Sequence, residues 1–178
     1  MARTKKTRYY KRARWSSNIS EISEDIVNAQ PGANCATTTL AFNPIQTNTA
    51  TSQVYTTKNF EVSFTFELNS DASAIGDKIE DITAYIMYVP QGMNVNASYN
   101  IQHPEYIMNY KFIGTPSGDN PEQGQQYQPY KLRTRLSRKL NTGDSVILFV
   151  KYNNTYTNAV SGKIMEIHGI VRWWTRAN

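Results

Sequence analysis

The residues best suited to chemistry stand at the start of the chain, where residues 2–15 read ARTKKTRYYKRARW. Half of these residues are Lys or Arg, and the first acid of the chain is Glu21. Lys and Arg neutralise phosphates, while aromatic rings stack on unpaired bases of any sequence. We therefore expect this basic arm (residues 1–15) to bind nucleic acid, the alternative being a solvated tail. The expected contacts are Arg3, Lys5, Lys6, Arg8, Tyr9, Tyr10, Lys11, Arg12, Arg14 and Trp15.

Part of the arm fits a second use. Lys11, Arg12 and Arg14 match a short nuclear import signal, a pattern that is common by chance and overlaps the binding residues. Such a signal would be read by a host import receptor while the arm is still exposed.

A second basic set lies in residues 130–140, YKLRTRLSRKL, which we expect to form one strand. Alternation places Lys131, Arg133 and Arg135 on one face and Leu132 with Leu136 on the other, in the core. Arg138 and Lys139 complete the set. Three interpretations remain open: a solvated edge strand, a second phosphate contact, or a contact with acids of a neighbouring subunit.

Catalytic chemistry finds little support in the sequence. The chain has two histidines, His103 in an expected loop and His168 in the last expected strand, beside Glu166 and Ile170 and opposite Ile167. There is no Gly-rich phosphate loop, no Ser/His/Asp motif and no metalloprotease pattern. We expect structural histidines, no enzyme activity, no cofactor and no metal site.

Charge is unevenly distributed along the 178 residues. The chain has 19 Lys and Arg against 14 Asp and Glu, and seven of the basic residues lie in the arm. The remainder is slightly acidic, so the arm alone explains the basic character, which favours a polyanionic partner. One cysteine, Cys35, excludes an intrachain disulfide. The absence of a long apolar run or a secretory signal leads us to expect no membrane partner and synthesis in a reducing compartment.

The elements that must position these residues are strands. KNFEVSFTFEL (58–68) alternates strictly, with Phe60, Val62, Phe64, Phe66 and Leu68 on one face. We expect further strands at 37–45, 82–89, 109–114, 130–140, 145–152 and 163–176, and an eighth within 94–101. Pro90 ends the third strand, residues 103–108 form a helical turn, and Asn141–Asp144 form a tight turn. Many short strands joined by turns indicate a β-sandwich or barrel.

The domain division follows from this pattern. Residues 1–34 are interpreted as the arm and a linker (16–34), and residues 35–178 as the β-domain. The terminal strand contains Trp173 and Trp174. These side chains pack in the core, or they form a contact between subunits.

Four stretches, in this order and spacing, resemble the capsid proteins of small circular Rep-encoding single-stranded DNA (CRESS-DNA, circovirus-like) viruses. They are YIMYVPQGM (85–93), HPEYIMNYKFIG (103–114), KLRTRLSRKLNTGDSVILFV (131–150) and HGIVRWWTRAN (168–178). The resemblance covers most of residues 55–178 and is looser over 16–54. Circovirus arms proper are longer and richer in arginine than this one.

The resemblance implies a single eight-stranded jelly roll whose last strand pairs beside the first. It also implies self-assembly into a small icosahedral T=1 shell of about 60 copies, with the arm directed inward onto circular single-stranded DNA. The protein would then be found in the virion, and in the host nucleus during assembly. Polar loops such as 114–129 would face outward towards a cell-surface receptor. The alternatives are the capsid of a satellite single-stranded RNA virus and a non-specific single-strand-binding β-barrel protein.

Overall fold

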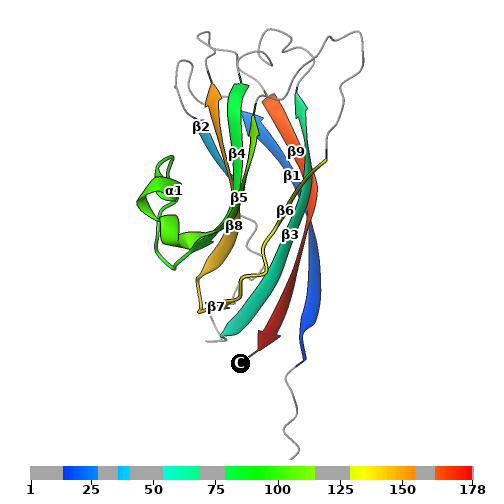
Figure 1. The fold of residues 1–178 in the computed structure, drawn as a ribbon, viewed down its shortest axis with the longest axis vertical. Helices are drawn as coiled ribbons and strands as arrows, with labels where there is room; N and C mark the ends of the chain where they lie inside the picture. Colours follow the sequence, from blue (N-terminus) through cyan, green and yellow to red (C-terminus); the bar gives the residue numbers. More distant parts are fainter. Residues whose placement is uncertain are drawn as a thin grey trace, which may run out of the picture.

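Two antiparallel β-sheets, packed face to face, make up the fold (Figure 1). The computed structural model describes residues 14–27, 36–40, 54–68, 79–114, 129–154 and 163–177. The strands in these residues are β1 (Ser16–Val27), β2 (Ala36–Leu40), β3 (Tyr55–Leu68), β4 (Ile79–Val89), β5 (Ile107–Gly114), β6 (Tyr130–Arg133), β7 (Arg138–Leu140), β8 (Ser145–Asn154) and β9 (Lys163–Ala177). A short helix, α1 (Tyr99–Gln102), and a 3-10 turn, η3 (Pro104–Tyr106), separate β4 from β5.

The strand order defines the fold class. Sheet A has the order β1-β9-β3-β6, with β7 also paired to β3, and sheet B has the order β2-β8-β4-β5. Because β6 and β7 both pair with β3, they occupy one strand position interrupted at residues 134–137. The orders are then first, eighth, third, sixth and second, seventh, fourth, fifth, which is the arrangement of a jelly roll. The chain is an all-β protein with this fold.

The alternating pattern of β3 explains the main core. Phe60, Val62, Phe64 and Phe66 are buried between the sheets, as the sequence predicts, while the residues between them face outward. The side chain of Leu68 lies outside the described residues. Burial of four such side chains stabilises the sandwich, at about 2 kcal/mol for each large apolar side chain.

Strand β4 is buried on both faces. Ile82, Ala84 and Ile86 face sheet A, whereas Met87 and Val89 belong to a second apolar cluster on the other side of sheet B. Tyr99 of α1 closes that cluster, since its side chain is 1% exposed and contributes to it. Figure 1 shows α1 lying against the outer side of sheet B.

Three sequence predictions about elements were wrong. Residues 16–27 of the expected linker form β1, which pairs with β9 along its whole length. Residues 94–98 form no strand, and α1 begins at Tyr99. As a consequence of the first error, the strand beside the last one is β1, and the pairing of last and first strands holds with β1 as the first, whereas β2 lies in sheet B. The division of the chain at residue 34 stays a prediction.

The third error concerns 130–140, which is two strands rather than one. Asn59 adopts φ +54° at a bulge in β3, and the pairing of β3 is interrupted there, between β7 at Thr57 and β6 at Glu61. The Thr134 amide donates to the Phe60 carbonyl, and the Leu136 amide donates to Thr134 Oγ1. Leu136 is therefore turned outward and is 53% exposed, so its predicted place in the core is wrong.

The remaining expected elements are confirmed within a few residues. β4 ends directly before Pro90, and the Asp144 amide donates to the Asn141 carbonyl across the predicted turn. β2 covers 36–40, and residues 41–45 of that expected strand lie outside the described residues. No helix in the described part of the chain is long and apolar enough to cross a membrane.

Candidate nucleic-acid interface

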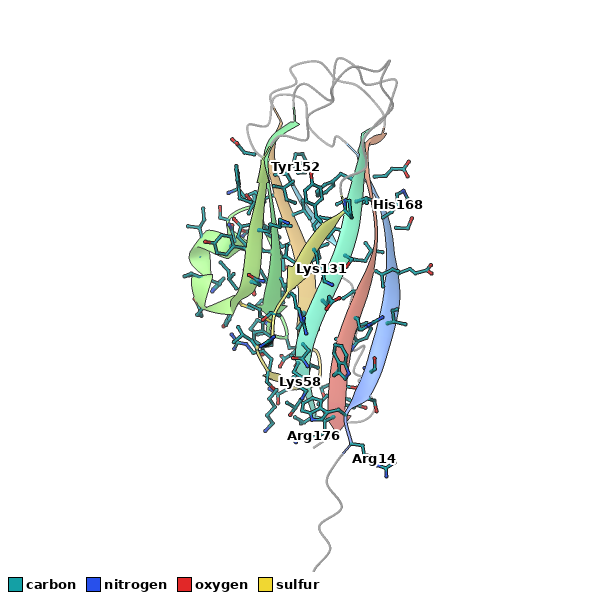
Figure 2. All side chains as sticks on the ribbon, turned by 45° about the vertical axis from the view of Figure 1, so that its right-hand side comes forward. Arg14, Lys58, Lys131, Tyr152, His168 and Arg176 are labelled. Atoms are coloured by element: carbon teal, nitrogen blue, oxygen red, sulfur yellow. The ribbon has the colours of Figure 1, made fainter. Side chains whose placement is uncertain are left out.

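Basic residues gather at one end of the outer face of sheet A, the face turned away from the core. Figure 2 shows Arg14, Lys58 and Arg176 at the end where β1 starts and β9 finishes. The Lys58 ammonium nitrogen lies 3.9 Å from the centre of the Trp15 ring, and the Arg176 guanidinium carbon lies 5.0 Å from it. Both distances are within the range of cation–π contacts.

Strand register brings these residues together. Ser16 pairs with Thr175, which places Trp15, the residue before β1, beside Arg176. On β3, Thr56 lies between Arg176 of β9 and Lys139 of β7. In the next row of the sheet, Trp174 lies between Ser17 and Lys58. We call Trp15, Lys58, Lys139, Trp174 and Arg176 the arm-root cluster.

A second group of cations surrounds one carboxylate further along the same face. Lys131 Nζ lies 2.7 Å from Glu61 Oε1, and Arg133 Nε lies 3.6 Å from Glu61 Oε2. The hydrogen bond from Lys131, together with the charges of Lys131, Arg133 and Arg172, holds the pKa of the Glu61 carboxyl below its ordinary value, although burial opposes this. Three cations thus share one acid, and the group keeps an excess of positive charge.

The structure separates the predicted basic set of residues 131–139. Lys131 and Arg133 are exposed with Leu132 buried between them, as the alternation predicts. Arg138 instead turns towards η3, where its guanidinium donates to the Glu105 carbonyl at 2.9 Å and lies over the Tyr88 ring. Arg135 is exposed in the interruption between β6 and β7, and Lys139 belongs with the arm-root cluster.

Most of the arm lies outside the described residues. Of its predicted contacts, Arg14 is exposed and Trp15 is half-buried, while the predicted contacts from Arg3 to Arg12 lie outside the described residues. Sequence reasoning missed Lys58, Arg172 and Arg176. Lys58 is the one cation of β3, whereas Arg172 and Arg176 both lie in β9, and only the register of β3 against β9 shows that they belong together.

Both histidines lie beside a glutamate on the surface. His168 Nε2 is 2.7 Å from Glu166 Oε2, and its Nδ1 is 3.4 Å from Ser23 Oγ, at the end of sheet A away from the arm. His103 Nδ1 is 3.3 Å from Glu105 Oε1, and its ring stacks on Tyr106. Among the described residues, no group of three or more His, Cys, Asp or Glu could hold a metal ion.

The two terminal tryptophans have different surroundings. Trp173 is 5% exposed and packs in the main core between the sheets. Trp174 points to the outer face and is half-buried there. The core interpretation is therefore confirmed for Trp173 but does not describe Trp174.

Comparison with known proteins gives structural similarities only. No family model matches the chain, and no curated protein matches it. A chain in a solved structure of Turnip yellow mosaic virus has 12% sequence identity to this chain and a TM-score of 0.42, and the match covers 90% of this chain and 93% of the other. Cocksfoot mottle virus is 6% identical with a TM-score of 0.40, covering 90% and 94%. Desmodium yellow mottle tymovirus is 12% identical with a TM-score of 0.39, covering 92% and 89%. At these scores and identities the similarities assign no function to this chain.

Proposed function

We propose that the chain is a viral capsid protein that self-assembles into a closed shell and packages a single-stranded nucleic acid genome. More specifically, we propose a small T=1 shell of about 60 copies around circular single-stranded DNA, as in the circovirus-like group that the four sequence stretches resemble. The observation that carries the proposal is the position of Trp15, the last residue of the basic arm. Trp15 directly precedes β1 of a jelly roll, at the end of sheet A where the cations of the arm-root cluster gather.

A jelly roll alone does not define a function, because the same fold serves capsids, lectins and cupins. The arm makes the difference, since seven cations without an acid form a site for a polyanion and leave the folded domain slightly acidic. A shell places many copies of that arm on one polymer, so weak individual contacts add up to stable packaging.

The mode of binding is independent of base sequence. Each arm cation that meets a phosphate releases a condensed counterion, which makes binding depend on salt. If all seven cations bind phosphates, the log–log slope of single-strand affinity against salt is roughly −5. Phosphate contacts do not separate DNA from RNA, because that distinction requires contacts with the 2′-hydroxyl.

Localisation follows from the same residues. Lys11, Arg12 and Arg14 would carry the protein to the host nucleus before assembly, and the finished protein belongs to the virion. Shell formation would cover the arm, so import and packaging use these cations one after the other.

Deletion of residues 2–14 tests the proposal. We expect the truncated protein to keep its fold by circular dichroism and to form empty particles or none, because the phosphate contacts are gone. The matched control replaces every arm arginine by lysine, which keeps the charge and should keep packaging. Normal packaging by the truncated protein, measured as nuclease-protected nucleic acid per subunit, would contradict the arm's role and leave the 131–139 residues as the main site.

Two further measurements separate the rival functions. A non-specific single-strand-binding protein would elute as a monomer or dimer during size-exclusion chromatography, whereas a capsid protein gives particles. Nuclease sensitivity and sequencing of the protected strand distinguish a DNA genome from a satellite RNA genome. Protected RNA of uniform sequence would overturn the DNA proposal while leaving the capsid proposal in place.

A further inference from the structure

The arm-root cluster carries positive charge that no described acid neutralises. Within the described ranges, Lys58, Lys139 and Arg176 make no ion pair, although Lys131 and Arg133 on the same face do. Glu61 is the acid nearest to Lys58 along β3, and its carboxylate already binds those two cations. The cluster therefore holds like charges close together on the outer face of sheet A, an arrangement that attracts an anion.

The cations are also held in place before any ligand binds. Lys58 and Arg176 both lie within 5.0 Å of the centre of one indole ring, although they come from different strands. Contact with the ring restricts two long side chains that would otherwise lose rotamer freedom on binding. A site that is ordered in advance loses less entropy when a phosphate arrives.

The neighbouring aromatic side chain indicates which anion fits. Trp174 is half-buried on the same face and lies opposite Lys58 in the register. Cations next to a partly exposed aromatic ring are the combination that binds single-stranded nucleic acid, with phosphates on the cations and a base on the ring. A small inorganic anion has no base that could stack on the ring.

Charge is unevenly distributed along the outer face of sheet A, from the arm-root cluster to the opposite end. From the arm-root cluster the next outward row on β9 is Arg172, which pairs with Glu61 of β3, opposite Arg133 of β6. Beyond these residues the face carries His168 bound to Glu166. The cationic half of the face thus adjoins the arm, and the half that carries Glu166 lies furthest from it.

We propose that the arm-root cluster is a second binding site for single-stranded nucleic acid, which continues the path of the strand from the arm onto the outer face of sheet A. This inference rests on the proposed function, since it assigns the same polymer to residues of the folded domain. Lys58, Lys139 and Arg176 bind phosphates, and Trp174 stacks on a base.

The test uses full-length protein dissociated to subunits and a fluorescent 30-nucleotide oligo(dT), with affinity measured by fluorescence anisotropy across a salt series. The double variant Lys58→Gln/Arg176→Gln should weaken binding at least five-fold. It should also reduce the magnitude of the salt slope by about 1.4, because each lost phosphate contact on a single strand contributes about 0.7.

The matched control is Lys111→Gln on β5, which also removes a lysine lying over an aromatic ring, since Lys111 Nζ is 5.6 Å from the centre of the Tyr130 ring. It should bind like the wild type. The charge-conserving variant Lys58→Arg/Arg176→Lys should also retain affinity, so a loss confined to the Gln variant is not a folding defect. Loss of binding in the charge-conserving variant as well would overturn phosphate binding by the cluster.

The outcomes separate this inference from the proposed function. If the wild type fails to bind oligo(dT), the proposed function fails, and the inference fails with it. If deletion of residues 2–14 abolishes binding and the double Gln variant binds normally, only the inference is overturned. Residual binding by the truncated protein that disappears in the double variant would support the inference directly.

Discussion

The Lys58 ammonium lies 3.9 Å from the centre of the Trp15 ring, which joins the last residue before β1 to the start of β3. Arg176 lies over the same ring from β9. Trp15 therefore contacts two strands of sheet A as well as leading into a third. Trp15, the last residue of the basic arm, is thus held between cations on the outer face of sheet A.

Replacement of Trp15 by alanine should lower the free energy of unfolding of the isolated subunit by about 1–2 kcal/mol, because two cation–π contacts of about 0.5–1 kcal/mol each are lost. Trp15→Phe should lose less, since a smaller ring remains. Urea denaturation followed by circular dichroism measures both. Equal losses for the two variants would show that the aromatic ring itself contributes nothing.

Gly169→Ala should destabilise the fold by about 1–3 kcal/mol, the usual range for overpacking a buried contact. A Cβ at this position of β9 would collide with the Ser63 carbonyl oxygen and would lie 2.8 Å from Phe64 Cβ. The matched control is Ser17→Ala on the exposed face of β1, which should change stability by less than about 0.5 kcal/mol. Thermal denaturation of the two variants checks the prediction, and a wild-type melting temperature for Gly169→Ala would refute the close approach of β9 to β3.

Tyr88 makes stability sensitive to alkaline pH. Burial, aided by its hydrogen bond of 2.9 Å to the Asp144 carboxylate, raises the pKa of Tyr88 to about 12 from an ordinary value of 10.0. The folded state favours the protonated hydroxyl, so the stabilisation is complete below pH 10.0 and is lost as pH rises towards 12. The pKa of Tyr99 is also raised to about 12, chiefly by burial.

The variant Tyr88→Phe should therefore be less stable than the wild type at neutral pH, because Asp144 loses a donor. Its stability should fall less steeply than that of the wild type between pH 10 and about 12, since one raised pKa is gone. Tyr110→Phe, at an exposed tyrosine of β5, is the matched control for removing a hydroxyl. Parallel curves of unfolding free energy against pH for Tyr88→Phe and the wild type would contradict the assignment of this pH dependence to Tyr88.

Glu61 makes stability depend on pH in the opposite sense, because its contribution is lost at acid pH. Its pKa is held below the ordinary 4.5, so its contribution is present above that pH and is lost as pH falls through the lower folded value. Glu61→Gln should reduce stability at neutral pH by less than about 1 kcal/mol, as expected for ion pairs at a surface. The difference from the wild type should shrink below pH 4.5 and in high salt. A difference that is constant with pH would mean that the charge of Glu61 has no part in it.

The fold was largely predictable because the strands carry strict alternation. The alternation from Phe60 to Phe66 identifies β3 without knowledge of its neighbouring strands. Pro90 marks the end of β4, and the Asn141–Asp144 turn marks the start of β8. Strand β1 was missed because SSNISEISEDIV has few large apolar residues, of which Ile22 is buried and Ile19 is 61% exposed. Its pairing with β9 stabilises it, and that partner is distant in sequence.

The candidate site was predictable only where its cations are adjacent in sequence. Lys131 and Arg133 could be placed on one face by alternation, whereas their neutralisation by Glu61 depends on the register of β6 against β3. The arm-root cluster could not be predicted, since Trp15, Lys58 and Arg176 come from three strands or their ends. The bulge at Asn59, which turns Leu136 outward, is likewise a property of two paired strands.

Electron microscopy of the full-length protein after expression and nuclease treatment tests the central claim most directly. The proposed capsid function predicts uniform closed particles of about 60 copies that contain protected single-stranded nucleic acid. Monomers or dimers at all protein concentrations, with no protected nucleic acid, would contradict it.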